Sequence, residues 1–398
     1  MASNTNTRVI FVQYMNPGAY PPLVHAAHIL GEAGSNVLFL GVSQPATRDL
    51  VVGSHPRIRV RLMAASPKGL LLKVHYAFWL LWTTITSLLW RADIVYASDP
   101  LGAPAGLLAA LLGKRVIYHE HDAPPAQGVG LTSLMRLVLA ARRQLAKRAS
   151  LCVFPGQKRL ALFRSAARPS APLISVMNCP RRNEVVARRS SKRFESSTIA
   201  LHYHGSLAPD RLPLTIVSAL QLLPAEVVLQ VIGYNAVGFE NYSDEIVEFA
   251  TKLGVAERVF VLGPVSSRDR MLMLAAEARI GLLLMQGSRF DPNFETMTGA
   301  SNKLFEYYAA GLAVLVSEAS GLRDAVLNTR TGLACDEKDV HALVRSIHSL
   351  SDLPQSRLVG ERGQQLILGD WNYETQFGPV EKFILNRPDG RDRIRRME

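Results

Sequence analysis

The sequence predicts an α/β protein made of two doubly wound parallel sheets, each formed by short buried strands that alternate with helices. Three observations predict this fold class. Apolar runs alternate with helical segments along the chain, the alternation restarts near Ile199, and a polar segment separates the two series. With 398 residues, 48% hydrophobic and 20% charged, the chain is long enough for two domains and has a globular composition.

The first series begins with a strand at Arg8 to Gln13 and a helix at Leu23 to Ala33. It continues with strands at Asn36 to Gly41, Ile94 to Ala97, Val116 to Tyr118 and Leu151 to Phe154, and a helix near Ala105 to Leu112. Their continuous apolar runs are typical of strands covered on both faces. We therefore predict a Rossmann-like domain over residues 1–185.

The second series predicts a domain over residues 198–370. Its strands are expected at Ile199 to His204, Val227 to Gly233, Val259 to Gly263, Ile280 to Leu284 and Ala313 to Ser317, with helices at Pro213 to Leu223 and Ser243 to Leu253. Asn178 to Ser197 contains Pro180 and paired arginines and is predicted as a linker. A last apolar helix is expected near Tyr373 to Leu385, within a C-terminal segment 371–398.

Leu70 to Trp90 is the one long apolar stretch, and Leu71, Val74, Phe78, Leu81, Ile85 and Leu88 fall on one helical face. Lys73, His75 and several Thr and Ser residues interrupt it, so it fits a membrane span poorly. A buried core helix is the favoured interpretation, and a helix lying in a bilayer surface is the alternative.

Charge is concentrated in one part of the chain. Residues Arg136 to Arg193 hold 15 Lys and Arg and one acid, Glu184, so this segment has a net charge of +14. The net charge of the whole chain is +12, and the rest of the chain therefore sums to −2. Such a segment suggests an anionic partner or a solvated basic surface, and the scarcity of aromatic residues disfavours nucleic acid. The three cysteines are widely spaced, and the polar start has no secretory pattern, so a cytoplasmic protein is expected.

Residues 301–311 form the most informative motif, Ser-Asn-Lys-Leu-Phe-Glu-Tyr-Tyr-Ala-Ala-Gly. Lys303 and Glu306 are three residues apart and share one face of a predicted helix, which Gly311 ends before a buried strand. An ammonium group suits a diphosphate, and a carboxylate suits ribose hydroxyls. The alternative is an ordinary amphipathic helix with a solvated ion pair.

This motif resembles the donor-binding signature of the GT-B glycosyltransferases, in particular the retaining family 4. The resemblance implies two Rossmann-like domains facing a cleft, a nucleotide diphosphate sugar as donor, no required metal, and a final helix that crosses back to the first domain. The family's first signature glutamate is missing, because Thr298 stands eight residues before Glu306. Backbone groups of the Gly-containing loop, with Glu295, are the expected replacement.

Further donor-binding residues follow from the resemblance. Arg211, in the loop after Ile199 to His204, resembles the basic residue that holds the diphosphate together with Lys303; its alternative is a surface ion pair. Glycines at such strand ends let phosphate or base approach the backbone. The other residues assigned to the donor are Gly205, Ser206, Gly233, Tyr234, Leu262, Gly263, Thr298, Gly299, Asn302 and Leu304.

In the first domain, Tyr118-His119-Glu120-His121-Asp122 ends a strand and resembles the family's catalytic histidine region. We expect His121 to stabilise charge near the anomeric carbon, so the catalytic set is His121, Arg211, Lys303 and Glu306. His119 shares its face and is the alternative; a metal site and a structural histidine held by Asp122 are the others. Gly18 and Tyr20 are expected to face donor phosphates and acceptor.

The chain lacks the Asp-x-Asp, Gly-x-Gly-x-x-Gly, Walker A and Gly-x-Ser-x-Gly motifs of other enzyme classes. The resemblance thus implies a glycosyltransferase with a lipid-linked, glycan or small-molecule acceptor, and the basic and apolar segments lead us to expect attachment to the inner face of the cell membrane. The alternatives are a sugar-nucleotide epimerase of the same fold, which would need more acids near the sugar, and a non-catalytic sugar-nucleotide-binding relative.

Overall fold

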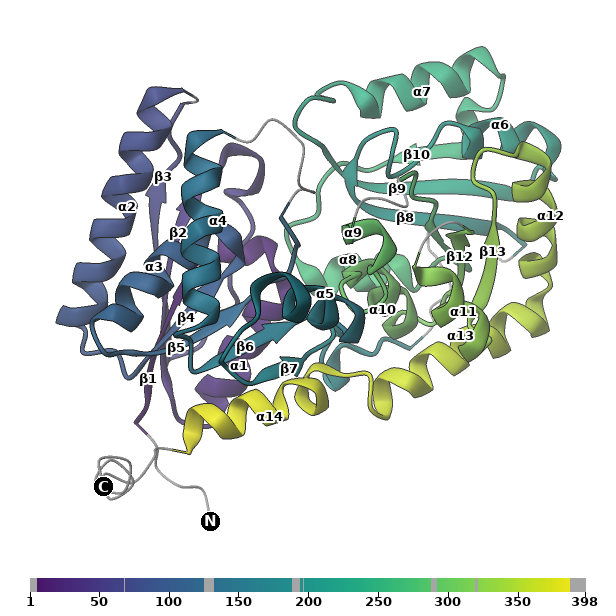
Figure 1. The fold of residues 1–398 in the computed structure, drawn as a ribbon. Helices are drawn as coiled ribbons and strands as arrows, with labels where there is room; N and C mark the ends of the chain where they lie inside the picture. Colours follow the sequence, from purple (N-terminus) through teal and green to yellow (C-terminus); the bar gives the residue numbers. More distant parts are fainter. Residues whose placement is uncertain are drawn as a thin grey trace. The chain divides into compact units, whose positions relative to one another are not determined.

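The computed structural model describes residues 6–67, 69–124, 132–187, 194–195, 197–287, 292–318 and 321–386. The chain divides into two compact units: unit 1 comprises Met1–Met177 with Tyr373–Glu398, and unit 2 comprises Asn178–Asn372 (Figure 1). Each unit is built around one parallel sheet, so the predicted fold class is confirmed.

The sheet of unit 1 has the strand order β3-β2-β1-β4-β5-β6-β7, and every pairing is parallel. The order changes direction between β1 and β4, and ligands of such sheets bind at the carboxyl ends of the strands beside that point. The strands are β1 (Arg8–Val12), β2 (Asn36–Ser43), β3 (Ile58–Ala64), β4 (Ile94–Ser98), β5 (Arg115–His119), β6 (Leu151–Phe154) and β7 (Leu173–Ser175). The helices are α1 (Pro21–Glu32), α2 (Leu70–Leu89), α3 (Asp99–Leu111), α4 (Ser133–Ala146), α5 (Gln157–Ala167) and α14 (Tyr373–Leu385), with short 3₁₀ turns η1 (Pro17–Ala19) and η2 (Pro45–Thr47).

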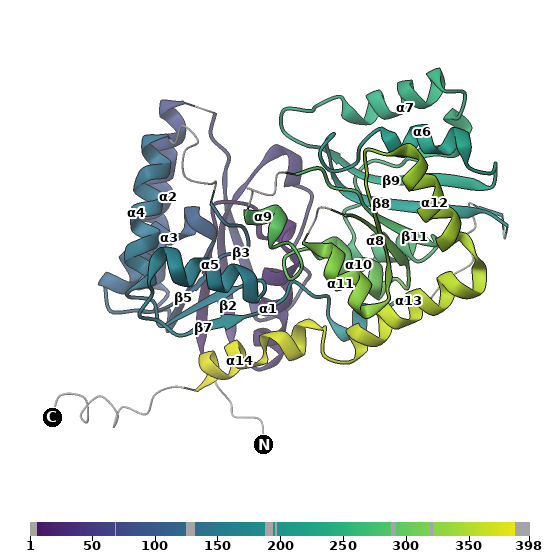
Figure 2. The ribbon, with the colours of Figure 1, turned by 45° about the vertical axis from the view of Figure 1, so that its right-hand side comes forward.

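Alternate residues of the unit 1 strands face two helical layers. In β1, Ile10 and Val12 belong to the core that includes α2, α3, α4 and α5, whereas Val9 and Phe11 belong to the core formed with α1 and α14. Figures 1 and 2 both show α2, α3 and α4 on one face of the sheet. Successive side chains of a strand point to opposite faces, so a doubly covered strand needs apolar residues at every position.

Helix α2 corrects the interpretation of Leu70 to Trp90 as a buried core helix. Its apolar stripe points outward, and Phe78 and Leu81 are 59% and 55% exposed. The inward face instead carries Tyr76, Trp79, Thr83 and Ser87. The hydroxyl groups of Thr83 and Ser87 donate to the carbonyls of Leu80 and Thr83 (3.0 and 2.7 Å), which makes their burial tolerable.

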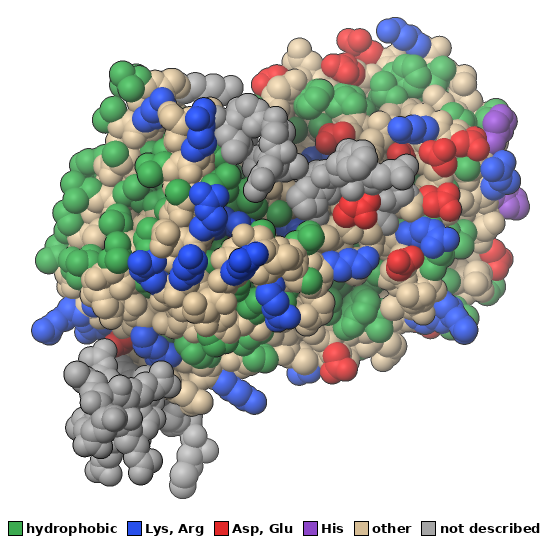
Figure 3. Space-filling view, viewed as in Figure 1, with side chains coloured by type: hydrophobic (Ala, Val, Ile, Leu, Met, Phe, Trp, Pro, Cys, Tyr) green, Lys and Arg blue, Asp and Glu red, His purple; other side chains and the backbone are tan. Residues whose placement is uncertain are grey.

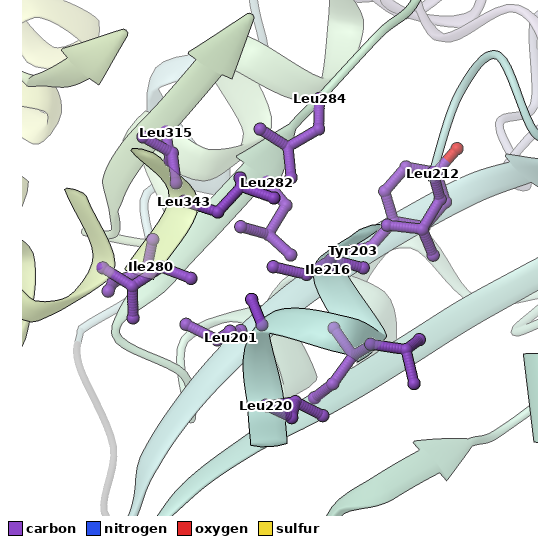
Figure 4. Packing of buried hydrophobic residues seen from close by; sticks show 14 of the residues in the cluster. Leu201, Tyr203, Leu212, Ile216, Leu220, Ile280, Leu282, Leu284, Leu315 and Leu343 are labelled. Carbon is purple, nitrogen blue, oxygen red and sulfur yellow. The ribbon is translucent and has the colours of Figure 1, made fainter. Parts of the chain in front are cut away.

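Unit 2 repeats the design with six parallel strands in the order β10-β9-β8-β11-β12-β13. Figure 4 shows its core, where side chains of β8 and β11 meet those of α6 and α12. The strands are β8 (Ile199–Leu207), β9 (Val227–Asn235), β10 (Val259–Val261), β11 (Ile280–Leu283), β12 (Ala313–Ser317) and β13 (Gly332–Cys335). The helices are α6 (Thr215–Leu222), α7 (Tyr242–Lys252), α8 (Arg268–Ala275), α9 (Pro292–Glu295), α10 (Asn302–Ala309), α11 (Leu322–Thr329), α12 (Val340–Ser351) and α13 (Leu353–Leu368), with 3₁₀ turns η3 (Arg182–Glu184) and η4 (Ala256–Arg258).

The beginning of the predicted linker is packed, contrary to its composition. The backbone N–H of Asn178 donates to the carbonyl of Gly299 (2.8 Å), and that of Val186 donates to Ala309 (2.9 Å). Glu184 pairs with Arg268. Residues 178–187 therefore belong to the surface of unit 2, while the rest of the predicted linker lies mainly outside the described residues.

Candidate functional site

Three glycines form a row at the carboxyl edge of the unit 2 sheet. Gly205 of β8 lies opposite Gly233 of β9, and the Gly233 N–H donates to the carbonyl of Gly263 (3.0 Å). A Cβ on Gly233 would lie 1.9 Å from the Gly205 oxygen, and Gly205 has φ +120°. Strands β8 and β9 can approach this closely only with glycine at position 233, and the three glycines leave bare backbone at the edge. Ser206, Tyr234 and Leu262 lie beside these glycines in the sequence.

Lys303 extends over the end of β8 from the first turn of α10. Its Nζ donates to the Tyr203 hydroxyl (3.0 Å) and lies 4.4 Å from the centre of that ring. The same ammonium lies 3.4 Å from the position that a Cβ on Gly205 would occupy. Burial and the neighbouring Arg211 lower the pKa of Lys303 to about 7. Lys303 thus lies beside the glycine row, with Arg211 close enough to lower its pKa, and this arrangement favours a phosphate group.

Glu306 is held in a buried network. Its Oε2 accepts a hydrogen bond from His204 Nε2 (2.7 Å), and its Oε1 pairs with Arg268, which also pairs with Glu184. Burial opposes ionisation, but Arg268 and His204 outweigh it and lower the pKa of Glu306 to about 2. The carboxylate predicted to bind ribose is therefore ionised, fixed in place and only 4% exposed.

The loop before α10 is anchored to the body of unit 2. Thr298, which stands where the family has its first glutamate, donates its hydroxyl to the Gly321 carbonyl (2.5 Å). Asn178 donates its backbone N–H to Gly299 and its Nδ2 to Ala300 (3.0 Å). Among the described residues, the buried Oδ1 of Asn302 has no hydrogen-bond partner. The loop thus presents a fixed backbone and one available acceptor next to Lys303; Leu304 is buried in the core.

The two predicted histidines of unit 1 lie together. The rings of His119 and His121 are 3.9 Å apart between centres, which confirms that they share a face. His119 Nδ1 is hydrogen-bonded to the Tyr96 hydroxyl (2.7 Å), and burial, with a contribution from His121, lowers its pKa well below the ordinary value. His119 is therefore a neutral core residue. The ring of His121 lies 5.8 Å from that of Tyr20, which leaves His121 as the better candidate.

The neighbours of His121 are structural acids. Glu120 accepts from Tyr118 (2.5 Å) and is paired with Arg142 of α4, while Asp122 lies 3.5 Å from Arg159 of α5. Asp122 is thus paired with an arginine. Within the described ranges, no group of three His, Cys, Asp or Glu side chains is arranged to hold a metal ion. Arg142 and Arg159 are also buried, so part of the predicted basic segment is internal.

The loop after β1 is tightly packed around Gly18. A Cβ on Gly18 would lie 2.5 Å from the Leu50 oxygen, and Asn16 donates its Nδ2 to Leu50 and accepts the Gly18 N–H, both at 3.0 Å. Packing alone therefore accounts for glycine at this position. Tyr20 is half-buried and donates its hydroxyl to Met15 Sδ (3.1 Å).

The sequence analysis did not identify the residues that hold the predicted site residues in position. His202 and His204 are two residues apart in β8, and residues at this spacing lie on the same face of a strand, so their shared face could have been inferred. Arg268 and Asn178, in contrast, are brought to the site by tertiary structure and carry no local signal. Asp99 is also missed; it accepts the His121 N–H (2.8 Å), and its place directly after a buried strand was the available signal.

Two family models match the chain. "Glycosyl transferases group 1" matches residues 187–365, and "Glycosyl transferase 4-like domain" matches residues 21–179. No curated protein has a sequence that matches the chain.

Solved structures match nearly the whole chain at low identity. Sucrose-phosphate synthase from Thermosynechococcus elongatus has a TM-score of 0.72 at 13% identity, covering 95% of this chain and 99% of the other. HepE from Anabaena, in complex with UDP and glucose, has a TM-score of 0.71 at 18% identity, covering 95% and 99%. WaaG, a glycosyltransferase involved in lipopolysaccharide biosynthesis, has a TM-score of 0.69 at 16% identity, covering 94% and 99%. These similarities establish the GT-B fold.

Proposed function

This chain belongs to the group 1 glycosyltransferases of family 4, which use nucleotide-sugar donors, and we propose that unit 2 binds the donor through Arg211 and Lys303. The observation that carries this proposal is the Lys303 ammonium group, which lies 3.4 Å from the position of a Cβ on Gly205, beside bare backbone. A diphosphate supplies the negative charge that such a group favours, and charge on the leaving diphosphate grows in the transition state. The complexes of HepE with UDP-glucose make UDP-glucose the first donor to test.

Glu306 is proposed to bind the donor ribose. His204 fixes Oε2, so Oε1 is the oxygen that can exchange Arg268 for ribose hydroxyls. Arg268 keeps its second partner, Glu184, during this exchange and is not left as an unpaired charge. Asn302 Oδ1 and the backbone at Gly299 and Gly263 complete the proposed donor site.

His121 is proposed to act on the transfer step and to contribute little to donor affinity. Its backbone is held by Asp99 and Arg159, so the ring has a defined position next to Tyr20. Family membership supports transfer with retention of configuration and without a required metal. Glu120 and Asp122, the acids next to His121 in the sequence, are paired with Arg142 and Arg159, so neither is a free base for the proton transfers of an epimerase.

A nucleotide-release assay with a panel of nucleotide sugars tests the proposed function. Release of nucleoside diphosphate coupled to a new glycosidic bond supports transfer. An isomerised donor sugar with no glycosidic product would identify an epimerase. Binding with no turnover against any acceptor class would identify a non-catalytic relative.

The acceptor is proposed to be lipid-linked, and α2 is proposed to lie on an anionic membrane surface. Its outward stripe includes Leu70, Leu71 and Val74, all at least 60% exposed, as well as Phe78 and Leu81. Figure 3 shows hydrophobic side chains gathered over the part of unit 1 where α2 lies, with Lys and Arg side chains nearby. Neither α2 nor α4 contains an acid, whereas Lys73, Arg136 and Arg143 are exposed.

Charge favours a bilayer over a second copy of the chain at this surface. Lys73 of α2 donates to Ser133 of α4 (3.2 Å), so cations of both helices border the apolar stripe. A symmetric dimer through this face would oppose these cations with no acid to pair them. Anionic lipid supplies the missing charge, at about 1 kcal/mol for each basic residue near the surface. No helix among the described residues is long and apolar enough to cross a bilayer.

Co-sedimentation with anionic and neutral vesicles at low and high salt tests the membrane proposal. We expect binding that needs anionic lipid, weakens with salt and is lost in Phe78→Ser/Leu81→Ser. The matched control is Leu222→Ser/Phe239→Ser, which changes exposed apolar residues of unit 2. Binding that is unaffected by α2, or a dimer in ultracentrifugation that α2 variants dissociate, would contradict it.

A further inference from the structure

A line of buried polar side chains crosses the unit 2 sheet on the face against which α10 packs. Gln230 of β9 and His202 of β8 lie opposite each other in the pairing of these strands, and His204 follows two residues later. All three are buried, whereas Leu201 and Tyr203 of β8 point to the other face, into the apolar core (Figure 4). The proposed function assigns no role to His202 or Gln230.

Hydrogen bonds join these side chains into one chain that ends at Glu306. Gln230 Oε1 is hydrogen-bonded to His202 Nδ1 (2.7 Å), and His202 Nε2 is hydrogen-bonded to His204 Nδ1 (3.0 Å). His204 Nε2 is in turn hydrogen-bonded to Glu306 Oε2 (2.7 Å). Every ring nitrogen of the two histidines therefore has a partner, in a core where an unpaired polar group would be costly.

The chain fixes how His204 faces Glu306. Glu306 is ionised, so its carboxylate accepts hydrogen bonds and His204 Nε2 must donate to it. Which ring nitrogen of a histidine carries the proton is set by the hydrogen bond that the other nitrogen makes, and for His204 that bond goes to His202. Burial, with a contribution from His204, lowers the pKa of His202 to about 3, so His202 is a neutral link. Without His202, the buried Nδ1 of His204 would lose its partner.

The ring of Tyr307 holds both imidazole rings in place. It packs edge-on against His202 and His204, with 5.8 and 5.0 Å between ring centres, and its hydroxyl donates to the Leu282 carbonyl (3.1 Å). Gly281 of β11 pairs with His202, and a Cβ on Gly281 would lie 2.5 Å from the Tyr307 ring. The glycine next to His202 thus leaves the room that the Tyr307 ring needs, and the two histidine rings are fixed from the side as well as end to end.

From this arrangement we infer that His202 and Gln230 are positioning residues for donor binding. Acting through His204, they hold the Glu306 carboxylate in the orientation that binds the ribose hydroxyls. The inference rests on the ribose role proposed for Glu306, whose Oε1 exchanges Arg268 for ribose while Oε2 stays on His204. Apolar side chains of similar volume would fill the same space without burying polar groups, so packing alone does not account for the chain.

Nucleotide binding with and without the ribose hydroxyls tests this inference. The probes are UDP and dideoxy-UDP, which lacks both hydroxyls, and calorimetry on the full chain gives the two dissociation constants. The wild type should prefer UDP about tenfold, because the Glu306 carboxylate accepts hydrogen bonds from the hydroxyls. His202→Leu and Gln230→Met should each reduce this preference about threefold or more. His202→Gln keeps a hydrogen-bonding side chain next to His204 and should retain most of the preference.

A matched control separates positioning from stability. Gln230→Met keeps the side-chain volume close to that of the wild type and removes the hydrogen bond to His202. Tyr308→Phe removes a buried hydroxyl of α10 that is hydrogen-bonded to Thr331 (2.6 Å). Each variant loses one buried hydrogen bond, so both should lower the midpoint of denaturant unfolding, but only Gln230→Met should lower the preference for UDP. Gln230→Met also carries the test if His202→Leu does not fold.

Glu306→Gln in the same assay keeps the inference and the proposed function apart. If Glu306→Gln loses the preference for UDP while His202→Leu and Gln230→Met retain it, only the inference is overturned. If Glu306→Gln itself retains the preference, the ribose assignment is refuted together with the inference. An equal loss of preference in Tyr308→Phe would assign the effect to general destabilisation and would also overturn the inference.

Discussion

The six strands of the unit 2 sheet follow the same order as six of the seven strands of unit 1, but the two sheets present different chemistry at their carboxyl edges. In unit 2 the edge carries Lys303 and Arg211, and both oxygens of Glu306 are already paired. In unit 1 the edge carries Asp99, with a pKa of about 7, and a buried oxygen of Gln13 that has no hydrogen-bond partner among the described residues. The first edge suits an anionic ligand, whereas the second carries a carboxyl group whose charge is disfavoured by burial.

This difference indicates that the fold determines where a ligand binds, whereas a few residues after the strands determine which chemical class of ligand binds there. The glycine row of unit 2 and the strained Asp99 of unit 1 occupy corresponding edges of similar sheets. One brings bare backbone and cations, whereas the other brings a carboxyl whose charge burial disfavours. Substitutions at the two edges should therefore have different effects.

Loss of the cations should have the largest effect. Lys303→Ala and Arg211→Ala should each lower turnover about a hundredfold or more, because the leaving diphosphate gains charge in the transition state. Steady-state kinetics with the donor measures this. Lys252→Ala, at the exposed end of α7, is the control, and a comparable loss there would show a nonspecific charge effect.

His121→Ala should lower turnover about a hundredfold and leave donor affinity nearly unchanged, because His121 belongs to unit 1. Rates at saturating donor, compared with the dissociation constant from calorimetry, separate the two effects. His341→Ala changes an exposed histidine of α12 and should behave like the wild type. Activity near wild type in His121→Ala would remove the histidine from the reaction.

Glu306→Gln should weaken nucleotide binding about tenfold, since charge-assisted hydrogen bonds to hydroxyls are lost. The structure adds a second effect: Arg268 and His204 lose an ionised partner, so the free energy of unfolding should fall as well. Calorimetry and denaturant unfolding measure the two losses, with the exposed Glu361→Gln as control. Unchanged nucleotide affinity in a folded Glu306→Gln protein would disprove the ribose assignment.

The pH dependence of donor binding should be the smallest effect. The Lys303 pKa of about 7 lies below its ordinary value, and a bound diphosphate favours the charged form. Affinity should therefore be full below pH 7 and fall by up to about tenfold per pH unit above it. Lys303→Arg stays charged and should flatten the profile from pH 6.5 to 8.5. An identical slope in this variant would assign the titration to another group.

Local pattern predicted much of the fold and part of the site. The apolar runs located the central strands, and the 301–311 motif placed Lys303 and Glu306 on the first turns of α10. Of the four edge strands, β10 was predicted and β3, β7 and β13 were missed, because strands that are only partly covered have a weak apolar pattern.

The remaining features depend on contacts that one sequence does not display. The periodicity of α2 revealed an apolar face but not its direction, which Tyr76 and Trp79 decide by packing on Tyr14. The sequence alone suggested that Arg142 is a surface charge, but in the structure Arg142 is buried and paired with Glu120. Likewise, the partners of Glu306 come from β8 and α8, which are distant in the sequence.

Calorimetric titration with UDP and with uridine tests the central claim most directly, namely that unit 2 recognises the diphosphate through Arg211 and Lys303. The wild type should bind UDP at least about a hundredfold more tightly than uridine, and Arg211→Ala should remove most of that difference while uridine affinity is retained. Equal losses of affinity for UDP and uridine in Arg211→Ala would contradict the claim.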